Sequence, residues 1–449
     1  MNRWLRRLFG ALTVLGASTA AAWSDHSIMA YRAMQPLLDP ARAVPVRVEP
    51  LEDFLRDQQT ALAKLTDEQE AWAQQHLTPY ASRPPALRWV AEPNRDAAAL
   101  RRSFLRALRL APDIKLALAL EVDPWNPPPA DAVSLARSAV DTLPGSGADF
   151  ERFVAVRPGR MIDALAVLAS ASDEPDHGLD INLWSDSPSS WGKEYGFGPL
   201  PFGNPALPYS TQAPFHMGFH DEDEILYKAA PFLRQTYVLL RIHQASTLAT
   251  LALRTGHEYW GWRFAGWALH YLQDLTQPYH ARTAPGFGTL RLLGINALAV
   301  LGWSSPKDHL VTRLSNRHLA LERYLAQRLQ ANAATRHPNS LEAALLDTQR
   351  DAIYPPWSDR YPQDQVSREA AELGDALDQA LLQGLPARYV DDPSFDFGAN
   401  EQSINLLAEL GEPDAPKLRA LNTLSVSLMQ HFGTHSRNLV RHFLRTPKP

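Results

Sequence analysis

The stretch "HYLQDLTQPYH", residues 270–280, brings two histidines, an aspartate and a proline into eleven positions. His270 and Asp274 are four residues apart, so on a helix they lie one turn from each other on the same face, where an imidazole and a carboxylate can bind one zinc ion together. Pro278 cannot continue the helical hydrogen bonding, so the chain is expected to turn there and to direct His280 elsewhere. The alternative interpretation is a buried, hydrogen-bonded His–Asp pair with His280 on the surface.

The beginning of the chain predicts a secretory signal peptide. A basic segment, "MNRWLRR", precedes a short apolar segment, "LFGALTVLG", and Ala20 and Ala22 satisfy the small-x-small rule for cleavage. We therefore expect residues 1–22 to be removed and the protein to be secreted or periplasmic; an uncleaved anchor is the alternative. Cleavage after Ala22 makes Trp23 the new N-terminus, whose free amine can be neutral and bind a metal together with His26.

These features resemble the zinc-dependent phospholipase C / S1-P1 nuclease superfamily. That family is marked by a mature N-terminal Trp, an early His, an H-x-x-x-D-x-x-Q-P-x-H core and a later H-x-x-x-D/E pair. The matching residues here are Trp23, His26, His270, Asp274, Gln277, Pro278, His280, His318 and Glu322. The resemblance implies an all-α fold, a multi-helix bundle of the phospholipase C / P1 nuclease type with helical insertions, which holds about three zinc ions.

The same resemblance requires one histidine and one aspartate upstream of the core motif. The segment "APFHMGFHDEDE" makes His216 the candidate histidine, with His220 as its competitor. The segment "SDEPDHGLD" favours Asp176 as the aspartate, with Asp180 next. A loop rich in Asp, Pro and Gly is also what an ordinary turn requires.

The resemblance further implies a role for each candidate ligand. Asp274 would bridge two ions, and Asp176 would also act as general base for the attacking water. The first ion would be completed by His216, His270 and Asp176, the second by Trp23 and His26, and the third by His280, His318 and Glu322. The last pair has an alternative as a solvated helix face, because Arg317 and Arg323 flank it.

Composition restricts the type of metal site. The 449-residue chain has no cysteine, so its metal ligands must be nitrogen and oxygen atoms. Its formal net charge is −5, and loss of Arg3, Arg6 and Arg7 with the signal peptide makes it −8. An acidic chain is a poor general binder of nucleic acid, although bound zinc ions supply local positive charge.

The chain is expected to form a single elaborated helical domain over residues 23–449, with insertions at 40–165 and 284–312. Amphipathic patterns predict long helices over 51–77, 223–254, 257–274 and 421–444, and a Gly-, Pro- and aromatic-rich stretch at 182–214 predicts a long ordered loop over the site. His431, His435 and His442 have no acidic partner at ligand spacing and are interpreted as packing or surface residues.

The apolar segment "GTLRLLGINALAVLGW", residues 288–303, is too short to span a membrane. It is expected either to be a buried core helix or to form an apolar cap that contacts a membrane surface.

Three functions fit these patterns. The first is a phospholipase C-type phosphodiesterase acting on phospholipid head groups through a metal-activated water, which Glu322 in the last pair and the absence of cysteine favour. The second is a P1-like single-strand nuclease or 3'-nucleotidase, for which aromatic residues in 184–209 could stack on bases. The third is a non-enzymatic secreted helical protein whose histidines are structural.

Overall fold

The computed structural model describes residues 26–39, 45–92, 94–126, 128, 132–143, 152–335, 339–412 and 415–447. Residues 1–22 and Trp23 lie outside these ranges, so the signal peptide and the N-terminal ligand remain predictions. The described chain is mostly helical, as expected, with a few short strands. It contains no helix that combines the length and the apolar character needed to cross a membrane.

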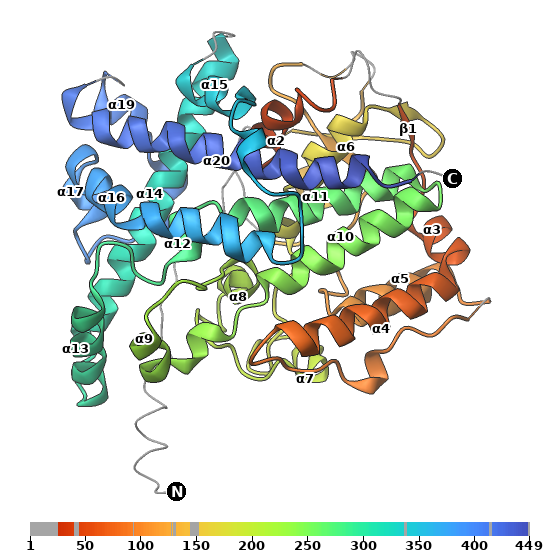
Figure 1. The fold of residues 1–449 in the computed structure, drawn as a ribbon, viewed down its shortest axis with the longest axis horizontal. Helices are drawn as coiled ribbons and strands as arrows, with labels where there is room; N and C mark the ends of the chain where they lie inside the picture. Colours follow the sequence, from red (N-terminus) through yellow and green to blue (C-terminus); the bar gives the residue numbers. More distant parts are fainter. Residues whose placement is uncertain are drawn as a thin grey trace, which may run out of the picture.

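Helix α11 (Glu258–Asp274) lies at the centre of the helical packing, and every residue from Tyr259 to Asp274 is buried. It packs along α10 (Val238–Arg254) and also contacts α6 (Ala164–Ala171) and α20 (Arg419–Leu444) (Figure 1). A helix surrounded in this way is apolar on all sides, so its few polar residues need specific partners.

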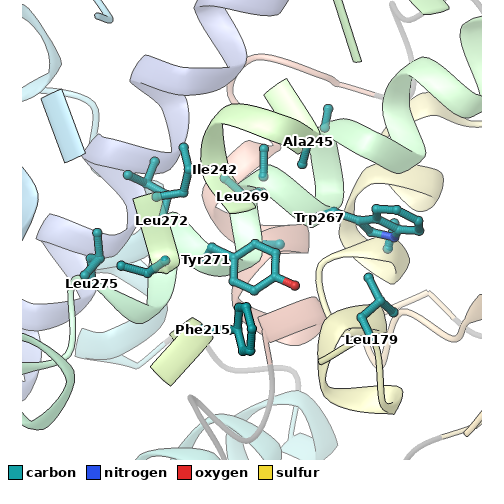
Figure 2. Close-up of a cluster of buried hydrophobic side chains, with 14 of the residues drawn as sticks. Leu179, Phe215, Ile242, Ala245, Trp267, Leu269, Tyr271, Leu272 and Leu275 are labelled. Atoms are coloured by element: carbon teal, nitrogen blue, oxygen red, sulfur yellow. The ribbon is translucent and has the colours of Figure 1, made fainter. Parts of the chain in front are cut away.

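Large apolar side chains hold α11 in place. Figure 2 shows Trp267 and Tyr271 of α11 in a buried cluster with Phe215 from α8 (Ala213–His216) and Ile242 from α10. Gly266 allows α6 to approach closely, because a Cβ atom there would lie 2.6 Å from the Cβ of Ala171. This close contact places the loop that follows α6 beside the last turns of α11.

The remaining helices surround this centre. Helix α2 (His26–Met34) packs on α6 and α20, and α15 (Ser340–Leu346) packs on α20 and α2. Helix α12 (Pro278–Ala281) packs on α16 (Arg368–Gly384). The other helices include α7 (Gly192–Tyr195), α14 (Ser305–Thr335), α17 (Ala387–Val390), α18 (Phe397–Asn400) and α19 (Leu406–Leu410).

The prediction that residues 40–165 form a helical insertion is only partly right. Helices α3 (Leu51–Asp57), α4 (Gln59–His76) and α5 (Ala97–Leu108) are present. However, β1 (Val46–Arg47) pairs antiparallel with β5 (Met161–Ile162), with Val46 opposite Ile162, and a second antiparallel sheet has the order β2 (Ala119–Glu121), β4 (Phe153–Ala155), β3 (Ser134–Leu135). Each strand is too short to show an alternating pattern in the sequence, so the sheets were not predicted.

Two predicted long helices are interrupted. The segment 51–77 divides into α3 and α4 at Gln58, and the segment 223–254 divides into α9 (Glu224–Ala229), a short 3₁₀ turn (Pro231–Arg234) and α10. Pro231 explains the second interruption, because proline begins a helical turn far more readily than it continues one.

The apolar segment 288–303 contains α13 (Thr289–Val300), and none of its twelve residues is buried. The expectation of a buried core helix is therefore wrong. The helix contacts α14 and α9 at one edge of the molecule (Figure 1). Leu290 of this helix is 83% exposed.

Candidate metal centre

The central motif folds as the position of its proline predicts. Helix α11 ends at Asp274, Gln277 has extended backbone angles, and α12 begins at Pro278. The side chain of Gln277 accepts a hydrogen bond from the amide of Tyr279, so it caps the new helix. His280 consequently leaves the axis of α11 but remains within 3.7 Å of Asp274.

The chain brings candidate ligands from distant segments to the end of α11. His26 is the first residue of α2, Asp176 lies in the turn after α6, and His216 is the last residue of α8. His318 and Glu322 lie one turn apart on α14. Three groups of side chains have ligand atoms close enough to share an ion: His26, Asp176 and His270; His216, His270 and Asp274; and His280, His318 and Glu322.

Asp274 lies between the first two groups. Its Oδ1 is 3.3 Å from Nε2 of His26, whereas its Oδ2 is 2.9 Å from Nδ1 of His216 and 3.4 Å from Nε2 of His270. The two oxygens of a single fully buried carboxylate thus face different sets of histidines. This arrangement suits a carboxylate that bridges two cations.

Asp176 lies next to the histidines that surround Asp274. Its Oδ1 lies 3.7 Å from Nδ1 of His216 and 3.9 Å from Nε2 of His270. The resemblance implied an ion held by Asp176, His216 and His270, and the structure brings these three together; it also groups Asp176 with His26 and His270. Asp176 is partly exposed while these histidines are buried, so it lies on the side of the centre that faces solvent.

The third group is buried as well. Nε2 of His318 is 2.7 Å from Oε1 of Glu322 and 3.1 Å from Nε2 of His280. The alternative of a solvated helix face for His318 and Glu322 is wrong, because their exposures are only 4% and 2%. Arg317, which suggested such a face, is itself buried and paired with Asp378.

Hydrogen bonds leave the ligand nitrogens of three histidines available. Nδ1 of His26 donates to the side-chain oxygen of Gln273, Nδ1 of His270 donates to the carbonyl of Ser172, and Nδ1 of His280 donates to the carbonyl of His216. In each case the Nε2 lone pair points into the centre. Metal-binding histidines typically have such a partner for the second ring nitrogen.

The polar atoms that lack partners fit cations. Nε2 of His26, Oδ1 of Asp274 and Oε2 of Glu322 are buried without a hydrogen bond. Two further pairs of imidazole nitrogens face each other at 3.0 and 3.1 Å. Such buried atoms are costly unless a proton or a cation lies between them, and nitrogen and oxygen ligands in this number suit zinc.

Burial and neighbouring charges shift the pKa values of these residues. Burial by itself would lower the pKa of His26, but the carboxylate of Asp274 outweighs it and raises this pKa to about 9. Burial would also lower the pKa of His216, but Asp180 and Asp274 together raise it to about 10. Burial lowers the pKa of His280 to about 3. Burial opposes ionisation of Asp274, but the surrounding imidazoles, beginning with His270, hold its pKa well below the usual range.

The structure separates the alternatives that the sequence left open. Among the described residues, His220 belongs to none of the three groups, and burial lowers its pKa to about 4. Asp180 is also outside the groups: Arg241 pairs with it at 2.7 Å and Tyr271 donates to it at 2.5 Å. The second oxygen of Asp180 lies 3.6 Å from Nε2 of His216, so it helps to orient that ring.

Supporting residues complete the site. Gln277 of the core motif donates to Glu322 at 3.1 Å. Gln273, which orients His26, and Gln212, which donates to Asp176 at 3.3 Å, had no signal in the sequence, and only their distant partners reveal these roles. Comparisons with protein-family models, curated proteins and solved structures found no match to this chain.

Proposed function

We propose that the protein is a secreted or periplasmic zinc-dependent phosphodiesterase of the phospholipase C / P1 nuclease superfamily, with the bundle fold of that superfamily. The observation that carries the proposal is the convergence of three ligand groups near the end of α11, two of which flank Asp274, whose two oxygens face different histidines. The ligands are imidazoles and carboxylates, which suits zinc better than calcium or magnesium, because the latter ions prefer oxygen ligands.

When bound, the zinc ions would supply positive charge for the phosphoryl oxygens and would acidify a water molecule. The chain holds the described candidate ligands: His26, Asp176, His216, His270, Asp274, His280, His318 and Glu322. We assign Trp23 as a further ligand through its amine. Asp176 is assigned as general base because its carboxylate is the partly exposed one, and Gln212 fixes its orientation.

The substrate that we propose is a phospholipid, cleaved on the head-group side of its glycerol. Exposed apolar side chains support contact with a lipid surface through 288–303: Leu290, Leu301 and Trp303 are 83%, 75% and 69% exposed. Ile225 on the adjacent α9 is 53% exposed and extends this surface. Apolar side chains of this size are seldom so exposed together unless they contact something.

The nuclease alternative receives less support. It requires aromatic residues of 184–209 to stack on bases, yet Trp184, Tyr195 and Phe197 are buried in a cluster with Phe215. Buried rings cannot act as stacking surfaces without a rearrangement of this cluster.

The proposal is tested by assaying the mature protein on phosphatidylcholine and on single-stranded DNA, before and after treatment with a chelator and after re-addition of zinc. We expect chelator-sensitive, zinc-restored release of phosphocholine. Chelator-sensitive cleavage of DNA instead would support the nuclease, and no hydrolysis of either substrate by zinc-loaded protein would support the non-enzymatic alternative.

A further inference from the structure

An apolar cavity of about 210 Å³ lies beside the third ligand group. Its walls include Phe202, Met217 just after α8, helix α9 with Leu226, helix α13 with Leu292 and Ile295, and helix α14 with Leu314. Aliphatic and aromatic side chains form most of the lining. A water molecule in such a cavity would find few hydrogen-bonding partners, whereas an apolar group would find many contacts.

The cavity adjoins the third ligand group through His318. Leu310, Leu314, His318 and Glu322 follow one another at four-residue spacing on α14, so they lie along one face of that helix. Leu310, Leu314 and His318 all line the cavity, and His318 and Glu322 belong to the third ligand group. Tyr279, which precedes His280, lines it too. The wall at this end of the cavity is therefore also a wall of the candidate centre.

The far end lies along the same helix. Lys307, the charged end of the lining, is eleven residues before His318, which corresponds to about 16 Å along a helix. Between the two ends the α14 wall is provided by Leu310, Val311 and Leu314. The cavity, called the channel below, thus has the candidate ligand His318 in its wall at one end and apolar side chains along the rest of its α14 wall.

We propose that this channel holds one hydrocarbon chain of the phosphodiester substrate while the phosphate lies at the candidate metal centre. The inference rests on the proposed function and adds to it the place in this chain that holds one alkyl or acyl chain of the substrate. A nucleobase would leave its polar edge unpaired against these walls. An apolar cavity of about 150 Å³ accommodates benzene, so about 210 Å³ corresponds to roughly eight carbons of one chain.

The first test is a series of soluble alkyl phosphocholines, from methyl to dodecyl, assayed for release of phosphocholine below their critical micelle concentrations, because in these esters the alcohol that carries the chain is the leaving group. We expect kcat/KM to rise about fourfold for each added methylene and to reach a plateau near roughly eight carbons. Equal rates for all esters would overturn the channel but leave the proposed function standing. Hydrolysis of no ester would contradict the proposed function itself.

A matched pair of variants tests the position of the channel. Leu314→Ala removes a side chain from its wall next to His318, so we expect the plateau to move to longer chains by about two or three carbons. Leu444→Ala makes the same change at a 47% exposed position at the end of α20, outside the lining and outside the apolar segment 288–303, and should leave the plateau unchanged. An unchanged plateau in Leu314→Ala, or the same shift in both variants, would overturn the assignment.

Binding to chelator-treated protein gives a readout that does not depend on activity. Calorimetric titration should show octyl phosphate binding at least tenfold more tightly than methyl phosphate, with a negative heat-capacity change that indicates apolar burial. This measurement remains informative if Leu314→Ala does not fold. Equal affinities for the two phosphates would contradict the proposal.

Discussion

Substitution of Asp274 by Asn tests the bridging role most directly. The change preserves the shape of the side chain but replaces one oxygen by an NH₂ group and removes the negative charge. The two oxygens of Asp274 lie 3.3 Å from His26 and 2.9 Å from His216. The amide of Asn has only one oxygen, so it can bind a cation on only one of these two sides. The variant should therefore disturb two ion sites.

The expected magnitude follows from this geometry. Electrostatic stabilisation by a catalytic metal contributes several kcal/mol, and a loss of about 4 kcal/mol corresponds to about a thousandfold in kcat/KM. His280→Ala removes a ligand from the third group alone. We expect it to lower kcat/KM by about a hundredfold or less, with loss of no more than one zinc ion.

Kinetics and zinc content of both variants provide the measurement, with phosphatidylcholine as substrate. Asp351→Asn is a matched control, because this carboxylate is 6% exposed and paired with Arg437 at 2.8 Å, outside the ligand groups. It should retain activity and zinc even if its melting temperature falls. Similar losses below about tenfold for Asp274→Asn and His280→Ala would refute the bridging role.

Three further predictions concern the metal and the lipid surface. Elemental analysis of the active mature protein should find about three zinc ions per chain, and less than one tightly bound ion would contradict the site. Zinc binding at pH 7 should release protons and should strengthen as the pH rises towards 9, because the pKa values of His26 and His216 are raised to about 9 and about 10 and ligation requires neutral imidazoles. Calorimetry in buffers of different ionisation enthalpy measures the proton release. A zinc affinity that falls between pH 7 and pH 9 would contradict this prediction. Leu298→Asp on α13 should weaken activity on vesicles and spare p-nitrophenyl phosphorylcholine, whereas loss of both activities with a lower melting temperature would refute the membrane contact.

Local spacing made the centre of the site predictable. The four-residue interval from His270 to Asp274 and the helix break at Pro278 depend only on helix geometry, and the structure has both. The same holds for His318 and Glu322, which share one face of α14. The spacing did not predict that this face is buried, because the neighbouring arginines are also typical of a solvent-exposed helix face.

The choice between Asp176 and Asp180 depended on a distant partner. Both residues occur in the same polar loop, and nothing local distinguishes them. Arg241, 61 residues away, pairs with Asp180, and the pair is fully buried next to Tyr271. A carboxylate held by an arginine in this way has little capacity left to bind a cation, which leaves Asp176 as the ligand candidate.

The C-terminal histidines illustrate the same limit. His431 and His435 had no acidic neighbour at ligand spacing, yet Glu369 of α16 lies 3.5 Å and 3.3 Å from their Nε2 atoms. Tyr361 shares a hydrogen bond of 2.8 Å with His435. These contacts agree with the interpretation of both histidines as packing residues. Their acidic partner comes from a different helix, so the spacing of residues within one helix could not predict it.

The arrangement around Asp274 also bears on whether these histidines are only structural. A structural histidine usually satisfies both ring nitrogens with hydrogen bonds, whereas here the Nε2 atom of His270 faces Nδ1 of His216 at 3.0 Å, and Nε2 of His26 lies 3.3 Å from Oδ1 of Asp274 without a hydrogen bond. Burying such groups without a cation is costly, and apolar residues would fill the same space at lower cost. Gln273 and the carbonyl of Ser172 nevertheless fix the rings so that their free lone pairs converge. Side chains held in this arrangement by specific partners could hold metal ions, and this supports the proposed metal centre over a purely structural role.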